Sequence, residues 1–520
     1  MLDDAPTDSS AVSVDCPEDN VPLSPHHVAL DDANQDAAES EGRVLARLSS
    51  DPLPEGLRSS IAWDPIPSLY NEAQITFDGL HYFNERVSGD LISINSHFNP
   101  YQVDVRRVDK DVPRIYASLL VATATLHRAM QEDVSFARSS ALVRREEHLF
   151  RFRIRALQEV NYRISQPDLQ SSDSTLMCVI CLLLTTMQQS AYTDWRAHLE
   201  GARKIIQLRG GLKEILSESP YLKPFLALFI VIDVMAATTA SSTHKHMAVA
   251  TSMALRYWES EAGIFQTILA VSAPCPEELF QSLILVNYLR SISEKPKSIS
   301  RRHAGTRMVL AKIRRFIPAE WAMQMREFKG WKRTGDGVEF NTPQDEAQSR
   351  SSLIKRSATV IDPSGIPEYN IWLSVGVVYR AAILLYAIRT LILDLPEGKE
   401  FLHGEGRTPD FERLRLETRE TLAGSLAPLF LSMDSTRRIG KLVFFPVFVC
   451  GMEANPNDRE LQEFITKGLQ MLGQTMGTFG PISAIDELKR KWAADAATPE
   501  GSHVTWDDYF RGRPDFIFGF

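Results

Sequence analysis

The feature that most constrains this chain is the spacing of its apolar residues, which recur every three or four positions from about residue 62 onward. The clearest stripes are Leu80, Phe83, Val87 and Leu91; Leu149, Phe152, Ala156, Val160 and Ile164; and Leu461, Ile465, Leu469, Leu472 and Met476. Such spacing puts apolar side chains on one face of an α-helix. Strand alternation with hairpin turns and a β-α-β rhythm are not found. The sequence therefore predicts an all-α fold, a large domain of packed helical hairpins.

Helix ends are also marked in the sequence. Ser171, Ser172 and Asp173 precede an apolar run and predict a helix start. Asn457 followed by Glu460 has the spacing of a capping box, in which the two side chains bond backbone N–H groups at the start of a helix.

The first 60 residues have a different composition from the rest. They hold 13 of the 66 acidic residues but 3 of the 57 basic ones, a net charge of −10, and they contain no Phe, Tyr or Trp. A segment like this buries too little apolar surface to offset the entropy of ordering. We therefore predict a disordered acidic arm over 1–60, serving as an activation segment or as a solubilising tail. Residues 61–520 are about neutral and are predicted to form one helical domain.

One long interruption divides the helical pattern. Residues 331–369 are polar and rich in Gly and Pro, which predicts a mobile surface loop inside the domain.

Two apolar runs, 225–240 and 375–395, are interrupted by charges: Asp233 in the first, and Arg380, Arg389 and Asp394 in the second. A spanning helix needs ~20 apolar residues with few charges. We expect buried core helices and no membrane segment.

No motif in the sequence predicts catalysis. Phosphate-binding glycine loops, zinc-protease and serine-hydrolase signatures are all missing. Cys178 and Cys181 form a C-x-x-C pair, but it precedes His198 and Glu200, the reverse of the order in zinc deaminases. The five cysteines of the chain are few for its length, which favours a reducing compartment over a disulfide framework. We expect no catalytic residue, cofactor or metal, and so no enzyme.

A basic stretch covers 295–319, with eight Lys and Arg residues and no acidic one. Two interpretations stay open: a solvated amphipathic helix, or a nuclear-import or nucleic-acid patch. In the second, the contributing residues are Lys295, Lys297, Arg301, Arg302, Arg314 and Arg315. The whole chain has a net charge of −9 and so lacks the excess of basic residues that is typical of a DNA-binding domain.

The segment 194–211, "DWRAHLEGARKIIQLRGG", reads as one complete helix. Asp194 is a suitable N-terminal cap, and Gly210 and Gly211 fit a left-handed C-terminal cap. Trp195, Leu199, Ala202 and Ile206 are predicted to lie along one face, with Ile205 beside it and with Arg196, Glu200, Arg203 and Lys204 mostly on other faces. We expect a Glu200–Lys204 pair, a structural His198, and a close helix contact at Gly201.

The same segment resembles the most recognisable stretch of the fungal-specific transcription factor domain, in the second of its two common forms. The shared motif consists of Trp195, His198, Leu199, Gly201, Ala202, Arg209, Gly210 and Gly211. Residues 81–105, 446–454, 458–470 and 485–492 resemble further helices of this family in the same order, so that the likeness extends over about 75–510.

The resemblance implies an all-helical regulatory domain in a nuclear protein that governs specialised metabolism, nutrient use or drug response. Family members usually carry a six-cysteine zinc cluster near the N-terminus that reads DNA. Ahead of Cys178 this sequence has only Cys16. We therefore expect no direct DNA binding and instead a DNA-binding partner or the transcription machinery, with homodimers as a further option. A gene segment missing upstream of Met1 is the alternative explanation.

A rival interpretation from another class is a helical protein that senses or binds a small molecule between its helices, or, less favoured, an enzyme with such a pocket. Its polar groups would be His198, Asp233 and Arg380, which lie in or beside apolar stretches.

Overall fold

The computed structural model describes residues 65–94, 99–107, 114–132, 140–190, 192, 195–243, 245–257, 263–292, 299–327, 331–334, 337–340, 368–395, 410–431, 443–498, 504–514 and 516–517. The chain divides into two units, Met1–Asn71 and Glu72–Phe520, and the account below concerns the second. The acidic arm predicted for 1–60 lies outside the described residues.

The elements of the N-terminal half are helices, with short π and 3₁₀ turns. They are α3 (Pro65–Tyr82), η1 (Phe83–Val87), η2 (Ser88–Leu91), η3 (Val105–Arg107), α4 (Arg114–Glu132), α5 (Ser140–Ser165), α6 (Asp173–Gln189), α7 (Trp195–Leu208), α8 (Leu212–Glu218), η4 (Pro220–Leu222), α9 (Lys223–Thr239), α10 (Lys245–Leu255) and α12 (Ile264–Val271).

The C-terminal half continues in the same way. Its elements are α13 (Glu277–Ser291), α14 (Ile299–Arg315), α15 (Pro318–Glu327), β1 (Trp331–Thr334), β2 (Gly337–Phe340), α17 (Glu368–Ile388), η6 (Arg389–Leu393), α19 (Phe411–Leu431), α20 (Phe444–Met452), α21 (Arg459–Met476), α22 (Gly480–Ala496) and α23 (Trp506–Phe510). The predicted all-α class is confirmed.

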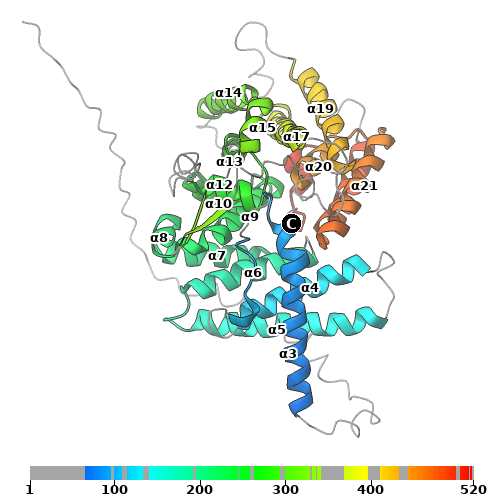
Figure 1. Cartoon of the computed structure of the whole chain (residues 1–520). Helices are drawn as coiled ribbons and strands as arrows, with labels where there is room; N and C mark the ends of the chain where they lie inside the picture. Colours follow the sequence, from blue (N-terminus) through cyan, green and yellow to red (C-terminus); the bar gives the residue numbers. More distant parts are fainter. Residues whose placement is uncertain are drawn as a thin grey trace, which may run out of the picture. The chain divides into compact units, whose positions relative to one another are not determined.

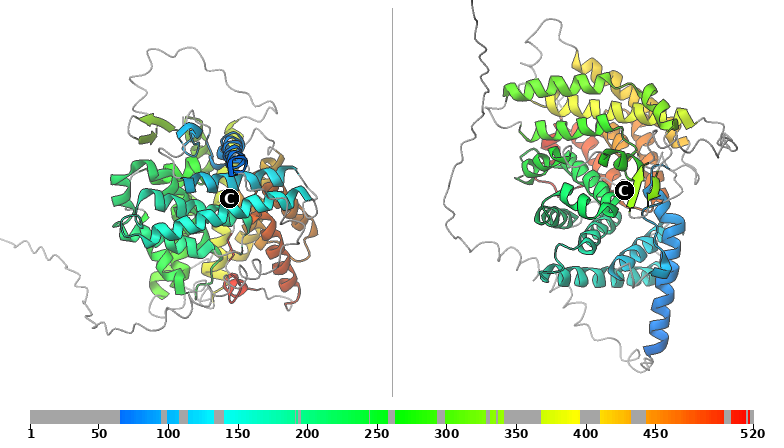
Figure 2. Two further views of the ribbon diagram at one scale, coloured as in Figure 1. Left: turned by 90° about the horizontal axis from the view of Figure 1, so that it is seen from below. Right: turned by 60° about the vertical axis from the view of Figure 1, so that its left-hand side comes forward.

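Two apolar helices organise the packing. Every residue of α9 from Pro224 to Thr239 is buried, and α9 contacts α6, α10, α12 and α13. Helix α17 has the same role in the C-terminal half, where α13, α14, α15, α19 and α20 surround it (Figure 1). The chain then returns to its beginning, because α21 packs on α4 and α22 packs on α6 (Figure 2). Segments about 300 to 350 residues apart in the sequence therefore share one core.

Two helices of the described residues are long and apolar enough to cross a membrane, one over Pro220–Thr239 and one over Asn370–Leu393. Within them, 94% and 72% of the most apolar window is buried inside the fold. That burial agrees with the expectation that both apolar runs are core helices.

The predicted stripes face the core, with a few residues at their ends left outside it. Leu80, Phe83 and Val87 are buried and Leu91 is partly buried, while Ile164 at the end of α5 is 45% exposed. The helix start at Ser172 is confirmed, since its hydroxyl accepts from the Thr175 N–H at 3.3 Å.

The capping box at Asn457 is wrong by one position. Asp458 caps α21 instead, accepting from the Leu461 N–H at 3.1 Å. Asp and Asn are about equally good caps, so that the sequence alone did not separate the two neighbours.

The structure also differs from the sequence-based expectation at the predicted loop 331–369. Its first part is an antiparallel hairpin of β1 and β2, with Trp331 opposite Phe340 and Thr334 opposite Gly337. Gly335 and Asp336 stand between the two strands in the chain, and Gly-Asp is a known signal for a two-residue hairpin turn. Residues 341–367 lie outside the described part, so their prediction as a loop is untested.

Candidate functional site

The predicted helix in the segment 194–211 is α7, and its C-terminal end forms as expected. The Gly211 N–H donates to the Ile206 carbonyl at 2.9 Å and the Gly210 N–H donates to the Gln207 carbonyl at 3.0 Å. These two bonds make a Schellman motif, which satisfies carbonyls left over at the end of a helix. Both glycines have positive φ, 86° and 113°, which explains the residue type. Asp194 lies outside the described residues.

The buried face of α7 is also confirmed, but the sequence pattern placed Arg203 on the wrong face. Trp195, Leu199, Ala202, Ile205 and Ile206 are buried as predicted. Arg203 is buried as well, at 3% exposure, and its Nε donates to Asp233 Oδ1 at 2.7 Å. Glu200 pairs with Arg203, not with Lys204 as expected.

Gly201 does not mark a close helix contact. A Cβ built at this position would meet only Val179 Cγ1, at 3.9 Å, which is ordinary van der Waals contact. The proposed packing role of Gly201 is therefore wrong.

The three polar groups suggested for a pocket do not form one site. Asp233 in α9 is buried and accepts from Arg203 and from the Tyr257 hydroxyl, the latter at 2.5 Å. Arg380 in α17 donates to the carbonyls of Ile313 and Arg314, at 3.2 and 3.1 Å, where α14 ends. His198 is a half-buried residue of α7. Asp233 and Arg380 thus hold helices together, as buried or helix-capping charges commonly do.

Sequence reasoning also missed the ion pair between Arg290 of α13 and Asp507 of α23. Arg290 is fully buried, and its Nη2 lies 2.8 Å from Asp507 Oδ1. It also donates to the carbonyls of Ala237 and Thr238, each at 3.1 Å, at the end of α9. Burial alone would raise the pKa of Asp507, but the Arg290 charge and hydrogen bonds from Arg290 and Ser242 hold it below its ordinary value.

The C-x-x-C pair lies inside α6. Cys178 and Cys181 are buried, and burial raises the pKa of Cys178 to about 12 and that of Cys181 well above its usual range. Both thiols therefore stay protonated and pack as small apolar groups. The part of the chain that the structure describes holds no group of three or more His, Cys, Asp and Glu side chains placed to share a metal ion.

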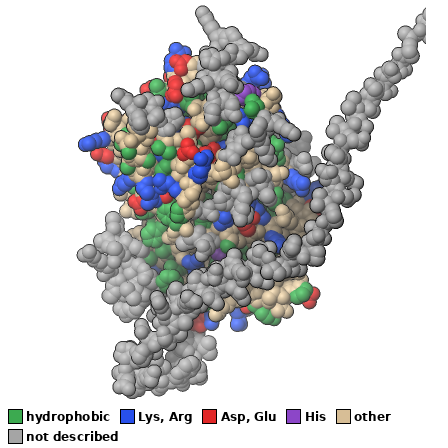
Figure 3. Space-filling view, turned by 180° about the vertical axis from the view of Figure 1, so that it is seen from behind, with side chains coloured by type: hydrophobic (Ala, Val, Ile, Leu, Met, Phe, Trp, Pro, Cys, Tyr) green, Lys and Arg blue, Asp and Glu red, His purple; other side chains and the backbone are tan. Residues whose placement is uncertain are grey.

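The basic residues of the stretch 295–319 differ in their exposure. Lys295 and Lys297 lie outside the described residues, whereas Arg301, Arg314 and Arg315 are exposed on α14. Arg302 is 1% exposed, so its side chain is not available on the surface. On the face that Figure 3 shows, basic and acidic side chains are intermixed and neither sign covers the surface.

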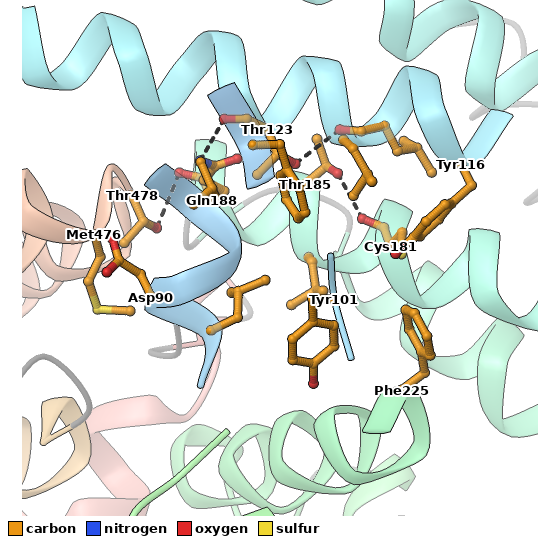
Figure 4. A pocket seen from close by; sticks show the side chains of 16 residues that line it. Asp90, Tyr101, Tyr116, Thr123, Cys181, Thr185, Gln188, Phe225, Met476 and Thr478 are labelled. Carbon is orange, nitrogen blue, oxygen red and sulfur yellow. Dashed lines mark hydrogen bonds between the residues drawn. The ribbon is translucent and has the colours of Figure 1, made fainter. Parts of the chain in front are cut away.

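A cavity of about 70 Å³, partly open to the surface, lies where η1, η2, α4, α6 and the end of α21 meet. Its lining is mainly apolar and comes from Phe83, Val87, Asp90, Leu91, Tyr101, Tyr116, Leu119, Leu120, Thr123, Cys181, Leu184, Thr185, Gln188, Phe225, Met476 and Thr478. Figure 4 shows Asp90, Gln188, Met476 and Thr478 gathered at one end and Tyr116 and Phe225 at the other. None of the polar groups proposed from the sequence lines it.

Comparison with known families decides what this helical domain is. The family described as "Fungal specific transcription factor domain" matches residues 79–519. The chain belongs to this family. The match extends from α3 to the residues beyond α23 and so includes the α7 motif, the Arg203–Asp233 and Arg290–Asp507 ion pairs and the cavity.

A curated relative agrees with the family assignment. The "Phomenoic acid biosynthesis cluster-specific transcriptional regulator" of Leptosphaeria maculans is 23% identical over 390 residues, which are 74% of this chain. The aligned part makes up 63% of the relative's own length. No solved structure matches the chain.

Within this fungal-specific transcription factor domain, the motif residues have structural places. Trp195, Leu199 and Ala202 anchor α7 in the core, and Gly210 and Gly211 end it. Arg209, the residue before the two glycines, lies 3.0 Å from Glu218 and also pairs with Asp173 at the start of α6. The motif therefore joins α6, α7 and α8.

Proposed function

We propose that this chain is a nuclear regulator of transcription that controls a specialised-metabolism gene set. The observation that carries the proposal is the family match over 79–519. The name of the relative, a regulator specific to one biosynthetic cluster, favours specialised metabolism over nutrient use or drug response. The proposal assigns no catalytic role to the chain.

The regulatory part of this proposal is tested by tethering. The 520-residue chain is fused to an unrelated DNA-binding domain, and transcription of a reporter carrying that domain's binding site is measured. We expect the fusion to raise or lower reporter transcription at least several-fold compared with the DNA-binding domain alone. Reporter output equal to that of the DNA-binding domain alone, with the fusion expressed at the same level, would contradict a regulatory role.

We also propose that these 520 residues do not read promoter sequence themselves and depend on a DNA-binding partner. Two observations support this: a near-neutral charge over 61–520, and charges of both signs on the surface shown in Figure 3. In a mobility-shift assay at 150 mM salt, the purified chain is expected to shift no promoter fragment of its target genes, whereas extract from the source cells restores a shift containing it. Tight, sequence-specific binding by the purified chain would overturn the proposal.

Nuclear entry is proposed to depend on the basic stretch. Because Arg302 is buried, the residues that remain for an import receptor are Lys295, Lys297, Arg301, Arg314 and Arg315. A fluorescent fusion with Lys295, Lys297 and Arg301 changed to Ala is expected to spread through the cytoplasm. A matched variant with Arg413 and Lys467, two exposed basic residues elsewhere on the domain, changed to Ala should stay nuclear. Nuclear accumulation of both variants would remove the basic stretch from the proposal.

The small-molecule alternative from the sequence has one specific observation in its favour, the cavity of about 70 Å³.

A further inference from the structure

A groove of about 460 Å³ lies between α21 and α22 on the surface of the domain. Helix α21 lies at the edge of the molecule in Figure 1, and its apolar stripe faces the core, so that its outer face supplies most of the groove. The residues that line the groove are Arg459, Gln462, Glu463, Thr466, Lys467, Gln470, Lys489 and Trp492. Its volume falls within the ~300–1,000 Å³ that is usual for binding sites.

The groove has an excess of positive charge, since three of its lining residues are basic and one is acidic. Arg459 and Lys489 are exposed, and within the described part of the chain no carboxylate pairs with either. Lys467 lies 3.8 Å from Glu463, but their side chains are 76% and 72% exposed, so this pair is weak. The groove therefore presents cations to the solvent and is complementary to an anionic partner.

The cations lie at two separate points along the groove. Helices α21 and α22 are joined by a short turn and form an antiparallel hairpin. Lys467, about nine residues before the end of α21, and Lys489, about nine residues after the start of α22, therefore lie at about the same level on opposite sides. Arg459 precedes Lys467 by eight residues of α21, which is about 12 Å along the helix. A single small anion reaches only one of the two points.

The part of the groove between these two points has a different character. Glu463 stands midway between Arg459 and Lys467, where its carboxylate repels a further anion and attracts a basic group. Trp492 is 7% exposed, and its Nε1 donates to the Gly451 carbonyl at 2.8 Å, so that the one polar atom of its ring is already bonded. The groove therefore matches a partner with acidic groups about 12 Å apart and a basic group between them.

We propose that this groove binds an acidic helical segment of a partner protein, with two carboxylates eight residues apart and a basic residue midway. A helix that lies along α21 has the same rise per residue, so its acids at i and i+8 reach Arg459 and the Lys467–Lys489 pair. Its basic residue at i+4 meets Glu463. This inference goes beyond the proposed function, and binding to the purified chain succeeds or fails independently of any effect on transcription.

The test measures fluorescence anisotropy of labelled, alanine-based helical peptides with the purified 520-residue chain. The first peptide has glutamates at positions 4 and 12 and lysine at position 8. A shuffled peptide of the same composition has its glutamates at positions 5 and 11, which moves them to other faces of the helix. A third peptide has the charges reversed. We expect the first to bind at least about fivefold more tightly than either of the others, which is within reach of three exposed ion pairs.

Variants of exposed residues locate the site. Lys489→Glu and Arg459→Glu are each expected to weaken binding of the first peptide at least about threefold, whereas Arg413→Glu, at a 75% exposed position of α19, should leave it unchanged. A fourth variant combines Arg459→Glu, Glu463→Lys, Lys467→Glu and Lys489→Glu, and it should prefer the charge-reversed peptide. Circular dichroism checks that each variant folds.

Three results would overturn the proposal. The first is equal or absent binding of the three peptides by the unmodified chain, and the second is an unchanged preference in the combined variant. The third is displacement of the first peptide by an equal concentration of a DNA duplex of unrelated sequence, which would assign the groove to nucleic acid.

Discussion

At the scale of single residues, the space around a helical glycine shows whether another helix packs closely against it. Gly201 and Gly451 both stand inside helices, but a Cβ on Gly451 would lie 2.5 Å from Leu488 Cδ1 and 3.2 Å from Ile465 Cγ2. Leu488 and Ile465 are fully buried, so neither side chain has room to move away. The tight approach thus lies between α20, α21 and α22, not at α7.

The first prediction follows from this contrast. Gly451→Ala is expected to lower the free energy of unfolding by about 1–3 kcal/mol through overpacking. Gly201→Ala should instead raise it by up to ~1 kcal/mol, because alanine favours the helix and nothing crowds its Cβ. Urea denaturation of the two variants checks both signs, and a destabilised Gly201→Ala protein would contradict this account of α7.

The second prediction concerns the charge of Asp507 and pH. The pKa values of three carboxyls, Asp507, Glu453 and Glu487, are held below their ordinary range: burial alone would raise them, but neighbouring arginines and, for Glu487, hydrogen bonds outweigh it. A carboxyl of this kind contributes stability that is complete above its ordinary pKa of about 4 and is lost as pH falls toward its folded-state pKa. The stability of the domain should therefore decrease below about pH 4.

Asp507→Asn isolates one of these groups. It leaves the buried Arg290 without its counter-charge, so that we expect a loss of about 3–5 kcal/mol at pH 7. Between pH 4 and pH 2.5 the variant should lose stability less steeply than the unmodified chain, since one titrating group is gone. Parallel pH–stability curves for the two proteins would show that Asp507 does not titrate as described.

At the scale of elements, the termini of α7 illustrate what local sequence determines. The Arg-Gly-Gly end of the helix was predicted correctly because positive φ is a property of the residues themselves. Gly211 has φ 113° and ψ −179°, a conformation that is essentially restricted to glycine. It also stands directly before α8, so one residue both ends a helix and begins the next.

The third prediction tests that role. Gly211→Ala is expected to destabilise the domain by about 1–3 kcal/mol from backbone strain. The matched control is Gly424→Ala in α19, where a Cβ meets nothing within 4 Å and φ is not positive, and it should be neutral or slightly stabilising. Thermal unfolding followed by circular dichroism measures both, and equal melting temperatures would refute the strain at Gly211.

Contacts that join distant elements were not predictable from the sequence. Arg203 was assigned to an outer face because arginine is usually exposed. In the structure it is buried, because it donates a hydrogen bond to Asp233, thirty positions later in the chain. Arg290 and Asp507 are more than 200 residues apart, and no local pattern connects them. The stripes in contrast were predicted well, since apolar spacing reports burial directly.

At the scale of the whole molecule, the return of the chain creates the cavity. Its lining combines η1 and η2, Tyr101, α4, α6, one residue of α9, the end of α21 and Thr478, and α21 reaches it because α21 packs on α4. Most of the lining residues taken alone read as ordinary core positions, and no local pattern connects them with Asp90 and Gln188, so sequence reasoning suggested His198, Asp233 and Arg380 instead. The family, by comparison, was recognisable from short ordered motifs along 75–510 and is confirmed by the match over 79–519.

The central claim is that this domain regulates transcription of a defined gene set. The most direct measurement is transcript profiling of source cells that lack the chain, compared with cells in which it is restored. We predict that the transcripts of neighbouring genes in one biosynthetic cluster change together, at least several-fold, and return when the chain is restored. Unchanged transcripts, under conditions in which the chain is expressed, would contradict the account.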